Sequence, residues 1–242
     1  MGDRAVDCAR LESVCAARHQ GFESPPIRSL FLLVLLFMFE SAAGAENNLA
    51  TAAREYQSAN FDAALAALDR AAPSSSPTPE SLNLRGLIYL EQEKFDDAKK
   101  AFEDAHNANP SLFAPRIHLA DLWLRQKKFV EARQIYQTLL KETNILMSSE
   151  RLRFAILLTY LGQHNDANAQ KALQSIPFPT ETPAYYYAQA AWAFAHDKES
   201  EAQDWIHQAG KIYKPAAAAW FAHHLYHFSW LKTKPALPAD QL

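Results

Sequence analysis

The chain has 242 residues, of which 24 are lysine or arginine and 27 are aspartate or glutamate, so its formal net charge is -3. A hydrophobic content of 49% is that of an ordinary globular protein and excludes a disordered or collagen-like chain. This charge balance provides no field that would attract a polyanion, so we predict no nucleic-acid partner.

An apolar run near the N-terminus predicts export. Residues 30–39 are all apolar, but the run is too short for a bilayer span, which needs about 20 residues. It follows Arg28 and precedes Ala43-Gly44-Ala45, the order of a secretory signal and its small-residue cleavage site. We therefore expect residues 1–45 to be a removable signal peptide and the mature protein to be periplasmic or secreted. An uncleaved anchor is the alternative, and it is the only membrane contact that we expect.

The first 45 residues also contain both cysteines of the chain. Cys8 and Cys15 leave with the signal, so the mature protein has no thiol. This excludes a disulfide, a thiolate metal site and a cysteine nucleophile. Acidic residues precede Arg28, which is unusual for a signal, and a start codon placed too far upstream would explain them.

Aromatic residues recur with a period of 34 in the middle of the chain. Phe61, Phe95 and Phe129 are separated by that step, and small and large apolar residues keep it on both sides of them. The further columns are Ala52, Gly86 and Ala120; Ala64, Ala98 and Ala132; and Leu68, Phe102 and Tyr136. Antiparallel helices approach closely where small side chains face each other, while large side chains fill the space between pairs. The period therefore predicts a stack of helix pairs.

The best-formed unit has a recognisable family pattern. Residues 80–110 have Gly86, Tyr89, Phe95, Ala98, Phe102, Ala105 and Pro110 in place, and so resemble a tetratricopeptide repeat. The resemblance implies an all-α fold, a right-handed solenoid of helical hairpins. We expect a first unit with its linker at residues 46–78, two well-formed units at 79–146 and two degenerate units at 147–214.

The pattern weakens after residue 146. In the fourth unit either Ala167 continues the alanine column, or a shift of two residues turns Ala169 and Ile176 inward, and the sequence leaves both registers open. Pro215 opens a last helix rich in aromatic residues. Because a solenoid must cover the apolar face of its last repeat, we expect residues 215–231 to be a capping helix. Residues 232–242 are predicted to be unstructured.

Few residues suggest chemistry. His223 and His227 lie one helical turn apart, with His224 between them, a spacing that can bind a metal. A metal-binding protein or an enzyme that uses this cluster is therefore the alternative function. The chain has no glycine-rich phosphate loop and no nucleophile elbow, and its paired acids fall on predicted polar faces. We predict no enzymatic activity and no cofactor.

The leading function is that of a binding scaffold. The family resemblance implies that the first helix of each unit lines a concave groove, a surface that repeat proteins commonly use for partners. The inward positions are Asn83, Leu87, Leu90, Ile117, Asp121, Leu124, Tyr187 and Phe194. Because these residues are mostly apolar, we expect the groove to bind a protein or a peptide. Whether the protein is a free adaptor or a component of an envelope assembly stays open.

Overall fold

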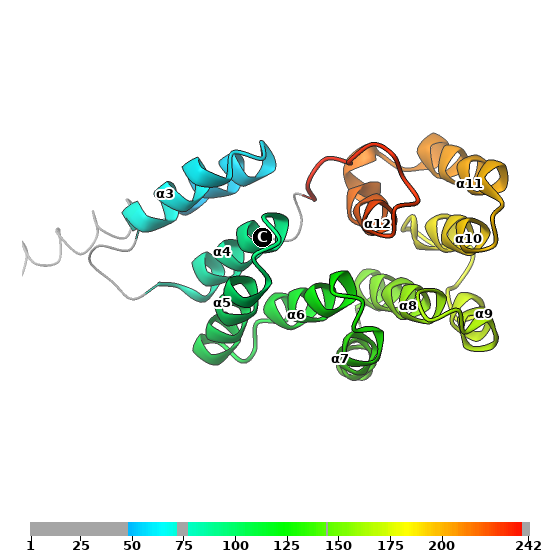
Figure 1. Ribbon diagram of the computed structural model, residues 1–242, viewed down its shortest axis with the longest axis horizontal. Coiled ribbons are helices and arrows are strands. Elements are labelled where there is room, and N and C mark those ends of the chain that lie inside the picture. Colours follow the sequence, from blue (N-terminus) through cyan, green and yellow to red (C-terminus); the bar gives the residue numbers. More distant parts are fainter. Residues whose placement is uncertain (1–47, 72–76, 144, 239–242) are drawn as a thin grey trace, which may run out of the picture. The chain divides into compact units, whose positions relative to one another are not determined.

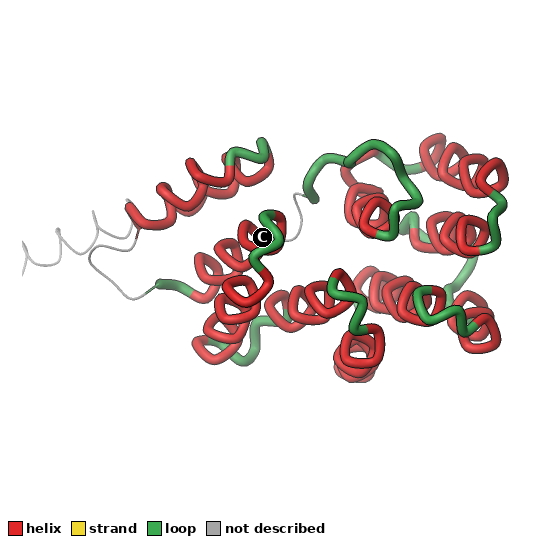
Figure 2. The backbone as a smooth tube through the Cα atoms, viewed as in Figure 1, coloured by secondary structure: helices red, strands yellow, loops and turns green. Residues whose placement is uncertain are grey.

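The computed structural model describes residues 48–71, 77–143 and 145–238. The chain divides into two compact units, residues 1–44 and 45–242, and the predicted signal at 1–45 lies outside the described residues. The described residues form helices and loops without any strand, which confirms the all-α fold class (Figure 2). Among them, no helix has both the length and the hydrophobicity needed to cross a bilayer.

The second unit is built from successive helix pairs. Residues 48–57 are helical and precede α3 (Phe61–Ala71). The later pairs are α4 (Pro79–Glu91) with α5 (Phe95–Ala108), α6 (Ala114–Arg125) with α7 (Phe129–Glu142), α8 (Leu146–Leu161) with α9 (Asp166–Gln174), and α10 (Ala184–Ala195) with α11 (Glu199–Ile212), before the unpaired α12 (Pro215–His227).

The first helices of these pairs form the inner layer of the second unit. In Figure 1, α6, α8 and α10 follow an arc, while α7, α9 and α11 lie on its outer side. The last helix, α12, lies within this arc. The first helix of each pair therefore faces inward, as the family resemblance implied, and the C-terminal segment occupies the space that they enclose.

Helix α4 shows how the sequence starts a helix. Thr78 is its N-cap, and the threonine Oγ1 accepts a hydrogen bond from the backbone N–H of Ser81 at 3.2 Å. Pro79 follows at the first helical position, where the missing N–H costs no intrahelical hydrogen bond. This pair of residues ends the linker and fixes the register of the best-formed repeat.

One turn recurs after every first helix. Its central residue has a left-handed conformation, with φ between 53° and 62°, at Ala59, Glu93, Lys127, His164, Asp197 and Ser229. The N–H of Lys94 then bonds to the carbonyl of Tyr89 at 2.9 Å, and the N–H of Trp230 bonds in the same way to Leu225 at 3.1 Å. Both are the six-to-one bond of a Schellman motif. Helix α12 therefore ends as the first helices do.

The structure decides the register of the fourth repeat. Ala169 is fully buried and Ile176 is 4% exposed, whereas Ala167 is exposed. The shifted register is therefore the one that α9 adopts. Asn165 is the N-cap of this short helix, and its side chain accepts a hydrogen bond from the N–H of Asn168. The helix therefore begins at Asp166, and the side of it that carries Ala169 points to the core.

The end of the described chain packs against the repeats. Residues 232–238 form no helix, in keeping with the two prolines in this stretch. They were predicted to be unstructured, but Leu237 is only 8% exposed and belongs to the same apolar cluster as Leu87. Lys234 also forms an ion pair with Glu91 of α4, at 2.9 Å. This apolar anchor and the charged contact hold the segment in place, which the local sequence did not indicate.

Close packing between α4 and α5 depends on Gly86. A Cβ atom at this position would lie 2.4 Å from Cε1 of Phe102, whose side chain is fully buried. Gly210 of α11 is the opposite case, since a Cβ there would meet nothing within 4 Å. The two helical glycines therefore differ in what surrounds them, although each costs helix propensity relative to alanine.

We expect Gly86→Ala to lower the free energy of unfolding by about 1 to 3 kcal/mol, because the added methyl group overpacks a buried ring. Gly210→Ala is the matched control and should raise it by up to about 1 kcal/mol. Chemical denaturation followed by circular dichroism measures both. Equal stabilities of the two variants would contradict the close packing at Gly86.

Candidate functional site

The C-terminal helix covers the inner face of the repeats through aromatic contacts. Phe221 and Trp220 of α12 are 1% and 3% exposed. The Phe221 ring lies 5.1 Å from the ring of Phe154 of α8 and 5.7 Å from that of Tyr187 of α10, between ring centroids. Trp220 also meets Phe154, edge to face. These contacts bury side chains on two neighbouring first helices.

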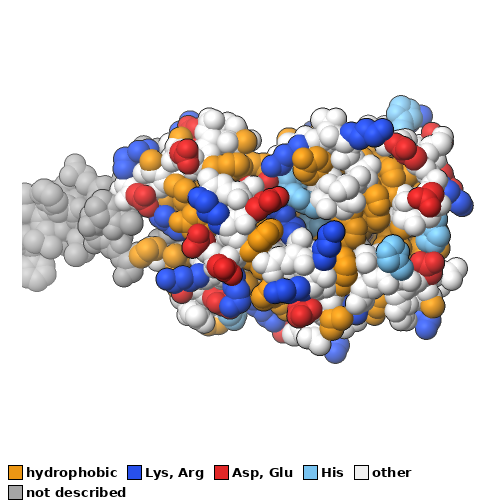
Figure 3. Space-filling model, in the orientation of Figure 1, with side chains coloured by type: hydrophobic (Ala, Val, Ile, Leu, Met, Phe, Trp, Pro, Cys, Tyr) orange, Lys and Arg blue, Asp and Glu red, His pale blue; other side chains and the backbone are white. Residues whose placement is uncertain are grey.

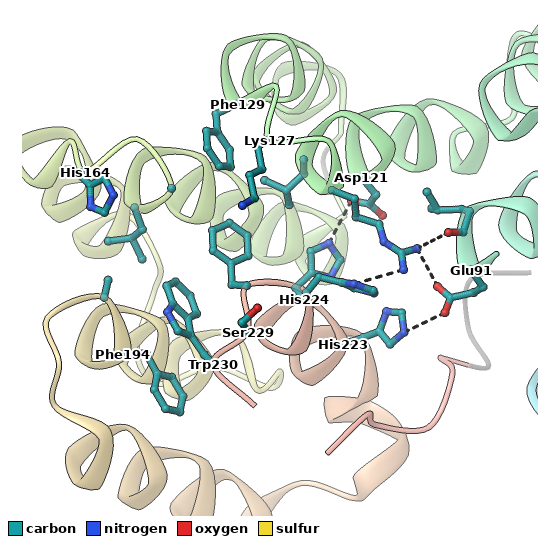
Figure 4. Close-up of a pocket in the computed structure, with 18 of the residues that line it drawn as sticks. Glu91, Asp121, Lys127, Phe129, His164, Phe194, His223, His224, Ser229 and Trp230 are labelled. Atoms are coloured by element: carbon teal, nitrogen blue, oxygen red, sulfur yellow. Dashed lines mark hydrogen bonds and ion pairs between the residues drawn. The ribbon is translucent and has the colours of Figure 1, made fainter. Parts of the chain in front are cut away.

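A charged cluster joins α12 and the end of the chain to α4 and α6. Glu91, at the end of α4, is paired through Oε1 with Nη1 of Arg125 at 2.9 Å. Its Oε2 lies 2.9 Å from Nζ of Lys234 and 3.5 Å from Nε2 of His223. The Glu91 side chain is 3% exposed, so a buried carboxylate is shared between the repeats and the C-terminal segment (Figure 4).

A second buried carboxylate repeats this arrangement one helix further. Asp121 of α6 accepts a hydrogen bond from the hydroxyl of Tyr136 of α7, and Nε2 of His224 lies 3.3 Å from the same Oδ1. The Nδ1 of His224 faces the carbonyl of Trp220 at 3.0 Å. Both acids therefore have a partner in the repeats and a partner in α12, and Glu91 also pairs with Lys234 beyond that helix.

The surroundings keep both acids ionised and favour the neutral form of His223. Burial opposes the charge of Glu91, but His223 and Arg125 outweigh it and hold the pKa of this carboxyl below its ordinary range. The pKa of Asp121 is likewise lowered, because His224 outweighs the effect of burial. Burial lowers the pKa of His223 as well. The acids are thus fixed negative charges at neutral pH.

A cavity of about 390 Å³ remains beside α12. Its walls combine leucines of α4, α6 and α8 with aromatic rings, among them Phe194 and Trp230, which stack at 6.0 Å with an interplanar angle of 10°. Figure 4 shows these two rings side by side, with Phe129 across the cavity. In Figure 3, apolar and histidine side chains appear between α12 and the arc of α6 and α8, with charged side chains around them.

The mouth of the cavity is formed by residues of the recurrent turn. Lys127, His164, Asp197 and Ser229 line the cavity, and all four are exposed. They are the left-handed residues that follow α6, α8, α10 and α12. The repeat geometry therefore brings one side chain from each of four turns to the same opening.

The structure brings most of the predicted groove residues together. Those that line the cavity are Leu87, Leu90, Asp121, Leu124 and Phe194. Asn83, Ile117 and Tyr187 are not among its lining residues. All of the predicted residues except Ile117 are buried, because α12 and the end of the chain cover the inner face.

Some site residues were not identified from the sequence. Glu91 and Arg125 are 34 residues apart, so opposite charges occupy one position of adjacent repeats, and that signal could have revealed the pair. Trp230 and Lys234 belong to the segment after α12, which folds back to the site. The sequence has no periodic pattern in this segment that would have predicted its position.

The histidine cluster and Glu91 bring three potential metal ligands together. Glu91, His223 and His227 can place one ligand atom each within 4.8 Å of one another. However, each oxygen of Glu91 already faces a cation, Arg125 or Lys234. Nη2 of Arg125 also lies 3.3 Å from Nδ1 of His227, and because arginine only donates, a neutral His227 carries its proton on Nε2. The two ion pairs of Glu91 already balance its charge and argue against a metal centre, although Nε2 of His223 and Nε2 of His227 are buried without a hydrogen-bond partner.

An arc of stacked helix pairs whose first helices share an inner face defines a helical-repeat solenoid. Residues 89–144 match the tetratricopeptide repeat family. Among solved structures, a thermophilic TPR protein from Thermus thermophilus is similar, with a TM-score of 0.53 and 17% sequence identity over 75% of this chain and 99% of that chain. No curated protein matches. The described part of the chain is thus a solenoid of the tetratricopeptide-repeat type.

Acid should destabilise the fold through its buried histidines. Burial lowers the pKa of His118 to about 4, and burial with the charge of Arg125 lowers that of His227 to about 2. The unfolded chain takes up these protons below about pH 6.5, and the folded chain does not. Between pH 6.5 and 5, each of the two should cost about 2 kcal/mol of stability, whereas the acids with lowered pKa lose their contribution only below about pH 4.5.

Urea unfolding at pH 7 and pH 5 measures this effect. The variant His227→Gln should lose about 2 kcal/mol less than the parent between these values, because its amide does not titrate. His207→Gln, at an exposed histidine of α11, is the control and should behave as the parent. An equal loss in the His227→Gln variant and the parent would contradict the burial of a neutral His227.

Proposed function

We propose that the protein is an exported, non-enzymatic scaffold that binds a protein or peptide in the cavity of its concave face. The repeat architecture supports this proposal, because stacked helix pairs present an extended concave surface that is commonly used for binding other proteins. Export rests on the apolar run at residues 30–39 and the small residues that follow it. The partner would then be met in the periplasm or outside the cell.

The observation on which the proposal rests most is the composition of the cavity. Leu87, Leu124 and Phe194 provide apolar walls, and exposed polar side chains surround the opening. The inner lining also contains two polar pairs, Glu91 with Arg125 and Asp121 with His224. The pocket therefore combines apolar walls with a few fixed polar groups, which is the usual form of a binding site.

The charges of the cavity favour binding over catalysis. A general acid or base works best when its pKa lies near the operating pH. Glu91 and Asp121 have pKa values below their ordinary range, so neither exchanges a proton readily near neutrality. Both acids instead serve as fixed hydrogen-bond acceptors for neighbouring side chains.

Filling the cavity should weaken partner binding. Ala195, the last residue of α10, lines the cavity and is half-buried. We expect Ala195→Phe to reduce the affinity for a partner identified by pull-down from an envelope extract by at least tenfold, because the ring occupies the space of an apolar anchor. Titration of the purified partner measures the change.

The matched control adds the same side chain elsewhere. Ala108, the exposed last residue of α5, is not among the residues that line the cavity. Ala108→Phe should leave the affinity unchanged, and both variants should keep the helical spectrum of the parent. Equal affinities of the two folded variants would show that the partner binds outside the cavity.

Processing tests the proposed export. N-terminal sequencing of the protein from the producing cell should give Glu46 as the first residue. Ala45→Lys should block cleavage, since signal peptidase requires a small residue there, and residues 1–45 should then stay attached. A cytosolic chain that retains residues 1–45 without any substitution would overturn the export proposal.

A further inference from the structure

The C-terminal helix presents two kinds of side chain to the inner face. Trp220 and Phe221 contact the aromatic rings of α8 and α10. Three residues further along the helix, His223 and His224 face the carboxylates of Glu91 and Asp121. An aromatic pair followed by a pair of imidazoles is therefore the pattern that the inner face accommodates.

The contacts to the two acids leave those acids partnered when α12 moves away. Glu91 keeps its ion pair with Arg125, and Asp121 keeps the hydrogen bond from Tyr136. Removing one partner from a buried charge is costly when nothing replaces it. Here each acid has a second partner within the repeats, so release of α12 does not leave an isolated buried charge.

Helix α12 is also connected to the repeats by a very short joint. Only Tyr213 and Lys214 separate the last residue of α11 from Pro215, and Lys214 has an extended conformation. The helix is thus a discrete element that ends in the turn of a first helix and has no second helix packed behind it within the described residues. A rotation at this joint would uncover the inner face without a change within the repeat pairs.

We propose that α12 and residues 228–238 are a built-in occupant of the concave face, which a partner helix of the same chemistry displaces. The partner would present an aromatic pair and, three residues later, a pair of histidine or basic side chains toward Phe154, Tyr187, Glu91 and Asp121. Charge complementarity favours this occupant, because the inner-face groups that meet the histidines of α12 are the carboxylates of Glu91 and Asp121. The proposal rests on the proposed function and extends its site, since the cavity is the part of the concave face that α12 leaves open and displacement of α12 uncovers the rest.

A synthetic peptide tests the proposal without a natural partner. The probe is a fluorescent peptide of residues 214–231, titrated into the purified protein. A helix on a short tether has an effective concentration of about 1 mM, so a probe at about 1 µM should occupy roughly one parent molecule in a thousand. Variants that loosen the internal helix should bind the probe at least tenfold more tightly.

Two variants change the occupant and leave the acceptor face intact. Trp220→Ala removes the aromatic contact with Phe154, and the pair His223→Ala with Lys234→Ala removes both contacts of the C-terminal segment to Glu91, together with the ring contact between His223 and His227. The second variant keeps the aromatic core in case the first fails to fold. Circular dichroism and melting identify variants that remain folded. A probe that carries Trp220→Ala and Phe221→Ala is the control and should not bind.

Each outcome bears on the proposal. Tighter probe binding by either folded variant, absent with the control probe, supports it. Probe binding that is equal in the parent and the folded polar variant overturns it, and so does a dimer of that variant that excludes the probe, since a second copy would then be the occupant. Because the probe replaces the natural partner, these results are independent of the Ala195→Phe test of the proposed function.

Discussion

The close approach of helices through glycine and an aromatic ring is the contact on which the architecture depends. Gly86 gives the Phe102 ring room between α4 and α5, and Gly162 does the same for Phe129, with a notional Cβ 2.4 Å from the ring in both cases. Interiors packed to this density do not tolerate an added methyl group without a shift. The first contact closes the pair of α4 and α5, and the second joins α7 to α8 of the next pair, so close packing acts both within a repeat and between repeats.

Buried acids give the inner face its polarity. Glu91 and Asp121 lie on successive first helices, and each is held by one residue of the repeats and by histidines of α12. Since a buried carboxylate is stable only with donors around it, the two acids determine which side chains can lie against the helices. The face is therefore selective in charge as well as apolar in area.

The fold could be predicted because its signal is local and periodic. Phe61, Phe95 and Phe129 mark successive helix pairs. Helix α5 begins at Phe95, and helix α7 begins at Phe129. The fourth register was ambiguous because alanines fit both faces, and only packing against the neighbouring pairs turned Ala169 inward. The site was predicted in part. Arg125 and His227 are in contact in the site although they lie 102 positions apart in the sequence. A repeat pattern with a period of 34 cannot predict such a contact.

The recurrent turn separates the recognition surface from the core. Its central residues have side chains although the left-handed conformation favours glycine, at a cost of about 1 kcal/mol or more for each. Lys127, His164, Asp197 and Ser229 therefore display a cation, an imidazole, an anion and a hydroxyl at one opening, on a backbone whose shape is set by hydrogen bonds within the turn. Substitutions at these four positions can therefore change what the opening recognises without altering how the helices pack.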